Sequence, residues 1–184
     1  ANHELQAAEL FAWALLAFPD APAAFRRGLL DILIEEQRHT RMYRARLAAA
    51  GADLGDFPVH GYFWSKVGTF TTPLRFVCAM SLTFENANLD HTLDYAAAAR
   101  KARDEKTARV IDRVHQEEIG HVRFGWTWLQ RLKSDDLSMW EAFTANLTWP
   151  LRPLRAKGRT FDVAGREAAG LDADFIHRLE AVDR

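Results

Sequence analysis

Apolar side chains recur at helical spacing along most of the chain, whereas the alternation that is typical of β-strands is scarce. This periodicity predicts an all-α fold. Prolines and glycines divide the pattern into segments, because proline is tolerated in the first turn of a helix and glycine favours a helix end. The pattern predicts four principal helices, at about residues 2–17, 22–50, 72–99 and 104–133.

A long connection, "GADLGDFPVHGYFWSKVGTF" over residues 51–70, separates the second and third of these helices. Connections of this length inside a compact domain usually have a packing or functional role. We expect four of its aromatic residues to pack onto the helices: Phe57, Tyr62, Phe63 and Trp64. Two helices, one long crossover and two further helices predict a four-helix bundle.

The chain after residue 133 differs in pattern, and we expect a bundle over 1–133 with a C-terminal extension over 134–184 packed on it. The extension has too few apolar residues for a core of its own. Within it, "SDDLSMWEAF" predicts a short helix capped by Ser134 or Asp135. A proline- and arginine-rich stretch predicts an irregular strap, and "LDADFIHRLEAVDR" predicts a terminal helix from about residue 172.

Composition narrows the functional classes. The 184 residues are 48% hydrophobic and 27% charged, with a formal net charge of −1, which argues against nucleic-acid binding. The single cysteine, Cys78, excludes an intrachain disulfide and a cysteine-rich zinc site. Charged residues interrupt every apolar stretch, and no signal-peptide pattern is present, so we expect a cytoplasmic protein without a membrane partner.

The sequence Glu-x-x-His occurs twice, as Glu36 with His39 and as Glu118 with His121. Residues three apart lie on the same face of a helix. In both helices this face coincides with a stripe of apolar residues, so both pairs are predicted to point into the interior. A buried carboxylate without compensation costs several kcal/mol, and a divalent metal ion compensates it while accepting imidazole nitrogen.

The other two helices supply one candidate carboxylate each. Glu85 is the only acidic residue between Asp56 and Asp90, and it lies on the apolar face of its helix. On the first helix Glu4 follows the apolar stripe, whereas Glu9 is about 140° away around the helix. Glu4 precedes Glu36 by 32 residues and Glu85 precedes Glu118 by 33, a near-symmetry that suits a dinuclear site between two helix pairs.

These residues resemble the ligands of the ferritin-like superfamily of carboxylate-bridged dinuclear metal proteins. Several motifs more closely resemble an uncharacterised bacterial ferritin-like family known as domain of unknown function 455, and that resemblance covers nearly the whole chain: "NHELQAAEL", "EEQRHTRMYRARL", "GDFPVHGYFW", "ENANLDHT", "HQEEIGHVRFGWTWL" and "PLRPLRAKGRTFDVAGREAAGL". The resemblance implies the bundle fold and a set of six metal ligands: Glu4, Glu36, His39, Glu85, Glu118 and His121. By analogy with such sites, Glu36 and Glu118 are expected to bridge two metal ions.

The leading functional hypothesis is a dinuclear metal oxidoreductase that activates dioxygen or peroxide to oxidise a small-molecule substrate, with an electron donor. Iron is the first choice for the two divalent ions, and manganese or a mixed pair are alternatives. We expect a monomer or homodimer. Two other hypotheses stay open: metal or oxidant handling of the ferroxidase or peroxidase kind, and a non-catalytic helical module in which arginines neutralise the acids.

Some nearby residues have alternative roles. His115, one turn before Glu118, is either an additional metal ligand, a partner of a ligand, or an ordinary polar residue. Tyr43, one turn beyond His39, is either a redox-active tyrosine or part of the core. Asp90 is expected on the surface, at a cap, or bonded to a ligating imidazole. The strap carries four basic residues, which receive an anion or are simply solvated or salt-bridged: Arg152, Arg155, Lys157 and Arg159.

Overall fold

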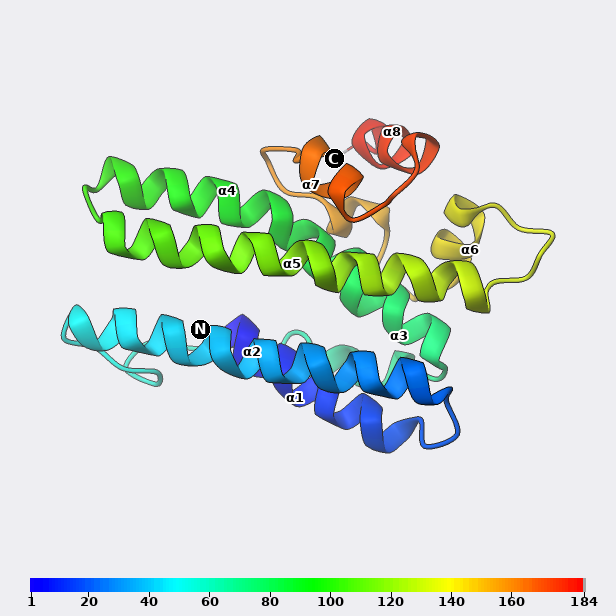
Figure 1. Cartoon of the computed structure of the whole chain (residues 1–184), viewed down its shortest axis with the longest axis horizontal. Coiled ribbons are helices and arrows are strands. Elements are labelled where there is room, and N and C mark those ends of the chain that lie inside the picture. The colour runs from blue at the N-terminus through cyan, green and yellow to red at the C-terminus, as the bar shows by residue number, and fades with distance from the viewer. Residues whose placement is uncertain (184) are drawn as a thin grey trace. The chain divides into compact units, whose positions relative to one another are not determined.

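A computed structural model describes residues 1–183, and this part of the chain is helical without any β-strand (Figure 1). The predicted all-α class is therefore confirmed. The chain divides into two compact units, one from Ala1 to Pro73 and a second that begins at Leu74. The expected arrangement of four helices in one bundle, and the expected boundary between 133 and 134, stay predictions.

The first unit is a pair of packed helices, α1 (Asn2–Ala17) and α2 (Ala23–Ala49). Their bounds agree with the sequence prediction to within a residue. Both helices bury apolar side chains completely, among them Phe11 of α1 and Leu29 of α2. Gly51 follows α2 with a φ of 79°, a left-handed conformation in which glycine has no steric cost.

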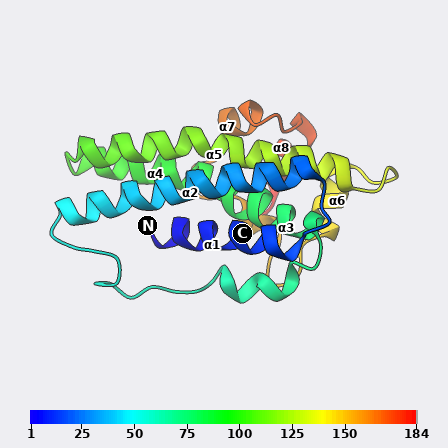
Figure 2. The ribbon, with the colours of Figure 1, turned by 60° about the horizontal axis from the view of Figure 1, so that its bottom comes forward.

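The long connection runs back alongside α1 (Figure 2). The carbonyl oxygen of His60 accepts hydrogen bonds from Asn2 and Gln6, and the Trp64 indole N–H donates to Glu9. The connection ends in a 3-10 helix, Trp64–Thr69. Its expected aromatic packing holds in part: the Phe63 ring lies 5.2 Å from the His3 ring of α1, whereas Phe57 is 61% exposed.

The second unit begins with three helical segments where the sequence predicts one helix. They are α3 (Pro73–Ala79), a π-helix (Met80–Glu85) and α4 (Asn86–Lys101). The Thr83 hydroxyl donates to the carbonyl oxygen of Cys78, five residues back, as the wider π turn permits. The π-helix packs on α5 (Glu105–Leu132), which begins after the side-chain cap of Asp104.

The approach of the π-helix to α5 is close because α5 has a glycine at the contact. A Cβ added to Gly125 would lie 2.4 Å from the Cβ of Ser81, a distance that real side chains do not reach. Gly125 therefore lets the π-helix lie directly against the backbone of α5.

The C-terminal segment of the second unit contains a short 3-10 helix, Pro153–Ala156, and three short α-helices: α6 (Met139–Ala145), α7 (Val163–Ala168) and α8 (Ala173–Ala181). The cap of α6 is Ser138, which forms a capping box with Glu141, so the prediction of Ser134 or Asp135 is wrong. The sequence analysis did not predict α7. Phe175 of α8 packs against Trp126 of α5 in an edge-to-face arrangement.

A buried ion pair holds this C-terminal segment against α4. Arg166 of α7 is completely buried, and its guanidinium donates to both carboxylate oxygens of Asp90, at 2.6 and 3.0 Å. Asp90 also accepts the backbone N–H groups of Gly158 and Asp162 at 2.7 Å. Asp90 is therefore neither a surface residue nor a partner of a ligating imidazole, because its two oxygens bind the C-terminal segment.

Candidate metal centre

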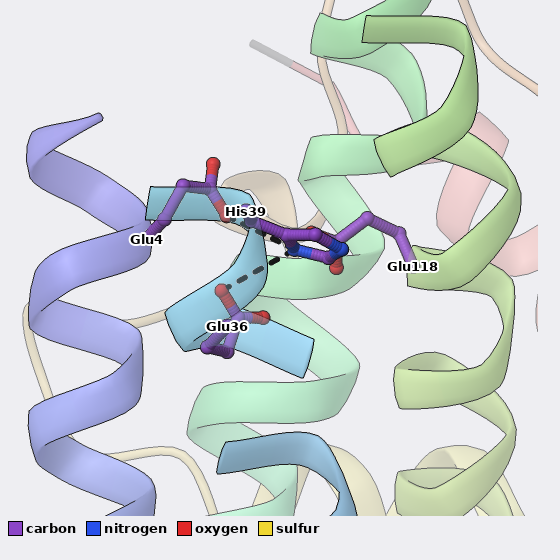
Figure 3. Close-up of side chains that lie close together, drawn as sticks. All are labelled: Glu4, Glu36, His39 and Glu118. Atoms are coloured by element: carbon purple, nitrogen blue, oxygen red, sulfur yellow. Dashed lines mark ion pairs between the residues drawn. The ribbon is translucent and has the colours of Figure 1, made fainter. Parts of the chain in front are cut away.

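The first unit brings three of the predicted ligands together. Glu4 projects from α1, and Glu36 and His39 project from α2, where the i, i+3 spacing places both on one face (Figure 3). The Nδ1 atom of His39 lies 3.5 Å from an oxygen of Glu36 and 3.6 Å from an oxygen of Glu4. Glu36 and His39 are completely buried and Glu4 is 6% exposed, whereas the rejected alternative Glu9 is exposed.

The second unit brings the other three together. Glu85 is the last residue of the π-helix, and Glu118 and His121 lie on one face of α5. One ligand atom from each of the three lies within 4.8 Å of the others. The Nδ1 atom of His121 is 3.2 Å from an oxygen of Glu118, and all three side chains are buried. We call the two groups the first triad (Glu4, Glu36, His39) and the second triad (Glu85, Glu118, His121).

The donors of both triads fit a divalent metal ion. Each triad offers carboxylate oxygens and the Nδ1 atom of one imidazole, which together suit iron and manganese. Four carboxylates held away from water require compensating positive charge. A metal ion supplies this charge and uses the oxygen and nitrogen atoms that already point toward one another.

The acidic residues beside the Glu-x-x-His pairs have other partners. Glu35 is paired with Arg38 at 3.6 Å, and Glu117 accepts from Arg113 at 3.1 Å. These two glutamates therefore serve as matched controls for the buried glutamates next to them.

His115 does not belong to either triad. Its Nδ1 atom lies 2.9 Å from the hydroxyl oxygen of Thr92, and its Nε2 atom lies 3.5 Å from a carboxylate oxygen of Asp162. Both ring nitrogens therefore face α4 and the C-terminal segment, which favours a structural role over that of an extra ligand.

Tyr43 is half-buried, and its redox role stays a prediction.

The basic strap is held by contacts within the second unit. The Thr160 hydroxyl and then the Arg159 guanidinium donate to the carboxylate of Asp94, and these hydrogen bonds hold the pKa of Asp94 below its usual range. Lys157 donates to the backbone carbonyl of Glu180. Arg152 lies over the ring of Trp149. The ion pair of Arg159 with Asp94 agrees with the salt-bridged interpretation, and the anion-binding alternative for the strap stays a prediction.

Asn88 was not predicted as part of the site, but its side-chain amide donates to an oxygen of Glu118 at 3.0 Å. A signal was present, because Asn88 follows Glu85 by three residues and so lies on the same face of its helix.

Cys78 is buried, and burial raises the pKa of its thiol to about 12, which makes it an inert core residue.

Comparison with known proteins assigns the chain to a family. The described residues are all-helical and include two buried triads, each made of one Glu and one Glu-x-x-His pair. These features are those of a candidate metal-binding helical protein. Residues 1–177 match the family described as "Protein of unknown function (DUF455)", and the chain belongs to that family.

A relative from Haemophilus influenzae, described as an uncharacterized protein, is 25% identical over 162 residues. This match covers 85% of the chain but 56% of the relative, so the chain spans little more than half of the relative's length. No solved structure matches the chain. Among the helices of residues 1–183, none is long and apolar enough to span a lipid bilayer.

Proposed function

We propose that this chain is a dinuclear metal protein in which the two triads jointly hold two divalent ions inside a ferritin-like four-helix bundle. One observation carries the proposal. Two helix pairs of the same chain each gather a buried Glu with a buried Glu-x-x-His pair, at separations of 32 and 33 residues. A single Glu-x-x-His arises often by chance, whereas two complete triads at matched spacing do not.

The residues of the two triads have parallel roles in this proposal. His39 and His121 each supply a neutral imidazole through Nδ1, the nitrogen that faces the carboxylates. Glu36 and Glu118, which have two oxygens each, would hold the ions as the bridging carboxylates, and Glu4 and Glu85 would be terminal ligands. Six protein ligands leave positions open for small molecules, as a reactive site requires.

We propose iron as the metal, with manganese or a mixed pair as alternatives, and oxidation of a small organic substrate as the reaction. When bound, such a metal pair supplies the electrons that activate dioxygen or peroxide. The π-helix that ends at Glu85 supports a reactive rather than a purely structural site, because π turns occur frequently at functional positions. We expect the protein to work in the cytoplasm as a monomer or homodimer.

The test is the metal content of the protein. Purified without chelators, or loaded with ferrous iron without oxygen, the chain should bind about two metal ions. Elemental analysis of Glu85→Ala and Glu36→Ala should show the loss of one or both ions. The matched variants Glu117→Ala and Glu35→Ala remove neighbouring glutamates that pair with arginines, and they should bind as much metal as the parent chain.

Two results would overturn the proposal. A folded parent chain that binds no metal would favour the non-catalytic helical module. Full metal content in Glu85→Ala would exclude that residue as a ligand. The native mass separates substrate oxidation from iron storage, because storage requires a cage of many subunits, whereas we expect one or two chains.

A further inference from the structure

Glu118 differs from a simple ligand because its two oxygens face different partners. Oε1 accepts a hydrogen bond from the side-chain amide of Asn88 at 3.0 Å, whereas Oε2 lies 3.2 Å from Nδ1 of His121. The carboxylate is completely buried, so water does not compete for either oxygen. The hydrogen bond from the Asn88 side-chain amide therefore determines the rotation of the Glu118 carboxylate.

Asn88 is itself held firmly. It lies on α4 one turn after Glu85, and its backbone carbonyl accepts the hydroxyl of Thr92 at 2.7 Å. Thr92 in turn contacts Nδ1 of His115 on α5 at 2.9 Å. The Thr92–His115 contact therefore links the turn of α4 that carries Asn88 to α5.

The buried ion pair fixes the same stretch of α4 from the other side. Arg166 binds Asp90, two residues beyond Asn88, and also donates to the backbone carbonyl of Asn86 at 3.2 Å. The residues from Asn86 to Thr92 are therefore tied both to α5 and to the C-terminal segment. A side chain on so constrained a helix can hold another group in place without much loss of entropy.

We infer that Asn88 is a positioning residue for the metal centre, which presets Glu118 so that Oε2 and the His121 imidazole are directed together at the ion. This inference rests on the proposed metal site. The amide donor removes one rotational freedom of the carboxylate before metal binds. The second triad is thereby preorganised by a neutral residue that is not a ligand.

The experiment is a titration with cobalt(II), followed by its visible absorption, in a chain that carries His39→Ala to disable the first triad. Adding Asn88→Leu, which removes the donor at similar volume, should weaken cobalt binding about 10- to 100-fold and shift the absorption bands. Adding Asn88→Gln, which keeps an amide donor, should restore most of the affinity. A purely structural role for Asn88 would not predict this recovery or the spectral change.

Asn146→Leu is the matched control, because the Asn146 amide donates only to the backbone carbonyl of Ala142 in α6. It should change cobalt affinity less than threefold. If Asn88→Leu does not fold, judged by circular dichroism, Asn88→Ala removes the donor without added bulk and replaces it.

Failure of this inference and failure of the proposed function give different results. If the parent chain binds no cobalt, the metal site itself is wrong. If the parent binds cobalt and Asn88→Leu or Asn88→Ala binds it with equal affinity and an identical spectrum, the metal site stands and the positioning role is excluded.

Discussion

The two units carry the same pattern, a buried Glu with a buried Glu-x-x-His pair, but different contacts hold the segments around it. In the first unit, exposed polar contacts hold the segment that follows the helices: Arg44 pairs with Asp53, and Trp64 donates to Glu9. In the second unit a completely buried arginine, Arg166, holds the C-terminal segment against α4. The same spacing of buried glutamates and histidines is therefore compatible with different contacts around the helices that carry them.

The difference matters because burial changes the consequence of breaking a contact. An exposed ion pair contributes about 0–1 kcal/mol, since water and salt screen it. Breaking a buried pair costs about 3–5 kcal/mol, because one charge is left without a partner or water. We therefore expect the loss of a tertiary contact to lower the free energy of unfolding more in the second unit than in the first. Three predictions test this contrast.

The largest effect is expected for Arg166→Met, which removes the guanidinium and leaves Asp90 buried with only backbone donors. The free energy of unfolding should fall by about 3–5 kcal/mol, measured by urea denaturation with tryptophan fluorescence. Arg178→Met is the control, because Arg178 forms an exposed pair with Asp174, and its loss should cost at most about 1 kcal/mol. Both pairs lie in the second unit, so equal losses in the two variants would remove the contrast between a buried and an exposed ion pair.

An intermediate effect is expected for Gly125→Ala, which places a methyl group against Ser81 where the π-helix meets α5. Overpacking of this kind costs about 1–3 kcal/mol and outweighs the gain in helix propensity. Gly120, five residues earlier on α5, has no neighbour within 4 Å of an added Cβ. Gly120→Ala should therefore stabilise the protein by about 0.5–1 kcal/mol. Thermal denaturation of both variants should show shifts of opposite sign, and stabilisation by Gly125→Ala would contradict the close approach.

The smallest effect is expected in the first unit, for Arg44→Ala. The Arg44 guanidinium, and after it the backbone N–H of Leu54, hold the pKa of Asp53 below its usual range. A lowered carboxyl pKa stabilises the folded state above the pKa of the unfolded chain, and this contribution is lost as pH falls through the folded pKa. In Arg44→Ala the pKa of Asp53 should rise toward its usual value, which an NMR titration measures, and the acid dependence of stability should weaken. An unchanged pKa would show that Leu54 alone lowers it.

The sequence predicted best the features that depend on interactions between residues close together in the chain. Helical periodicity placed Glu36 with His39, and Glu118 with His121, on buried faces, and it chose Glu4 over the exposed Glu9. These conclusions need only the rotation per residue of an α-helix and the spacing of apolar side chains. The membership of both triads was therefore predictable before any tertiary contact was known.

The sequence by itself determined the helices, the side of each helix that is buried, and the residues that each pair of helices gathers into a triad. Only the tertiary structure decided that a π-helix presents Glu85, that Asn88 holds Glu118, and that Arg166 binds Asp90. The physical reason is the separation along the chain over which each interaction acts. Helix periodicity acts within a few residues, whereas the Arg166–Asp90 pair joins positions 76 residues apart, and its formation depends on how whole segments pack.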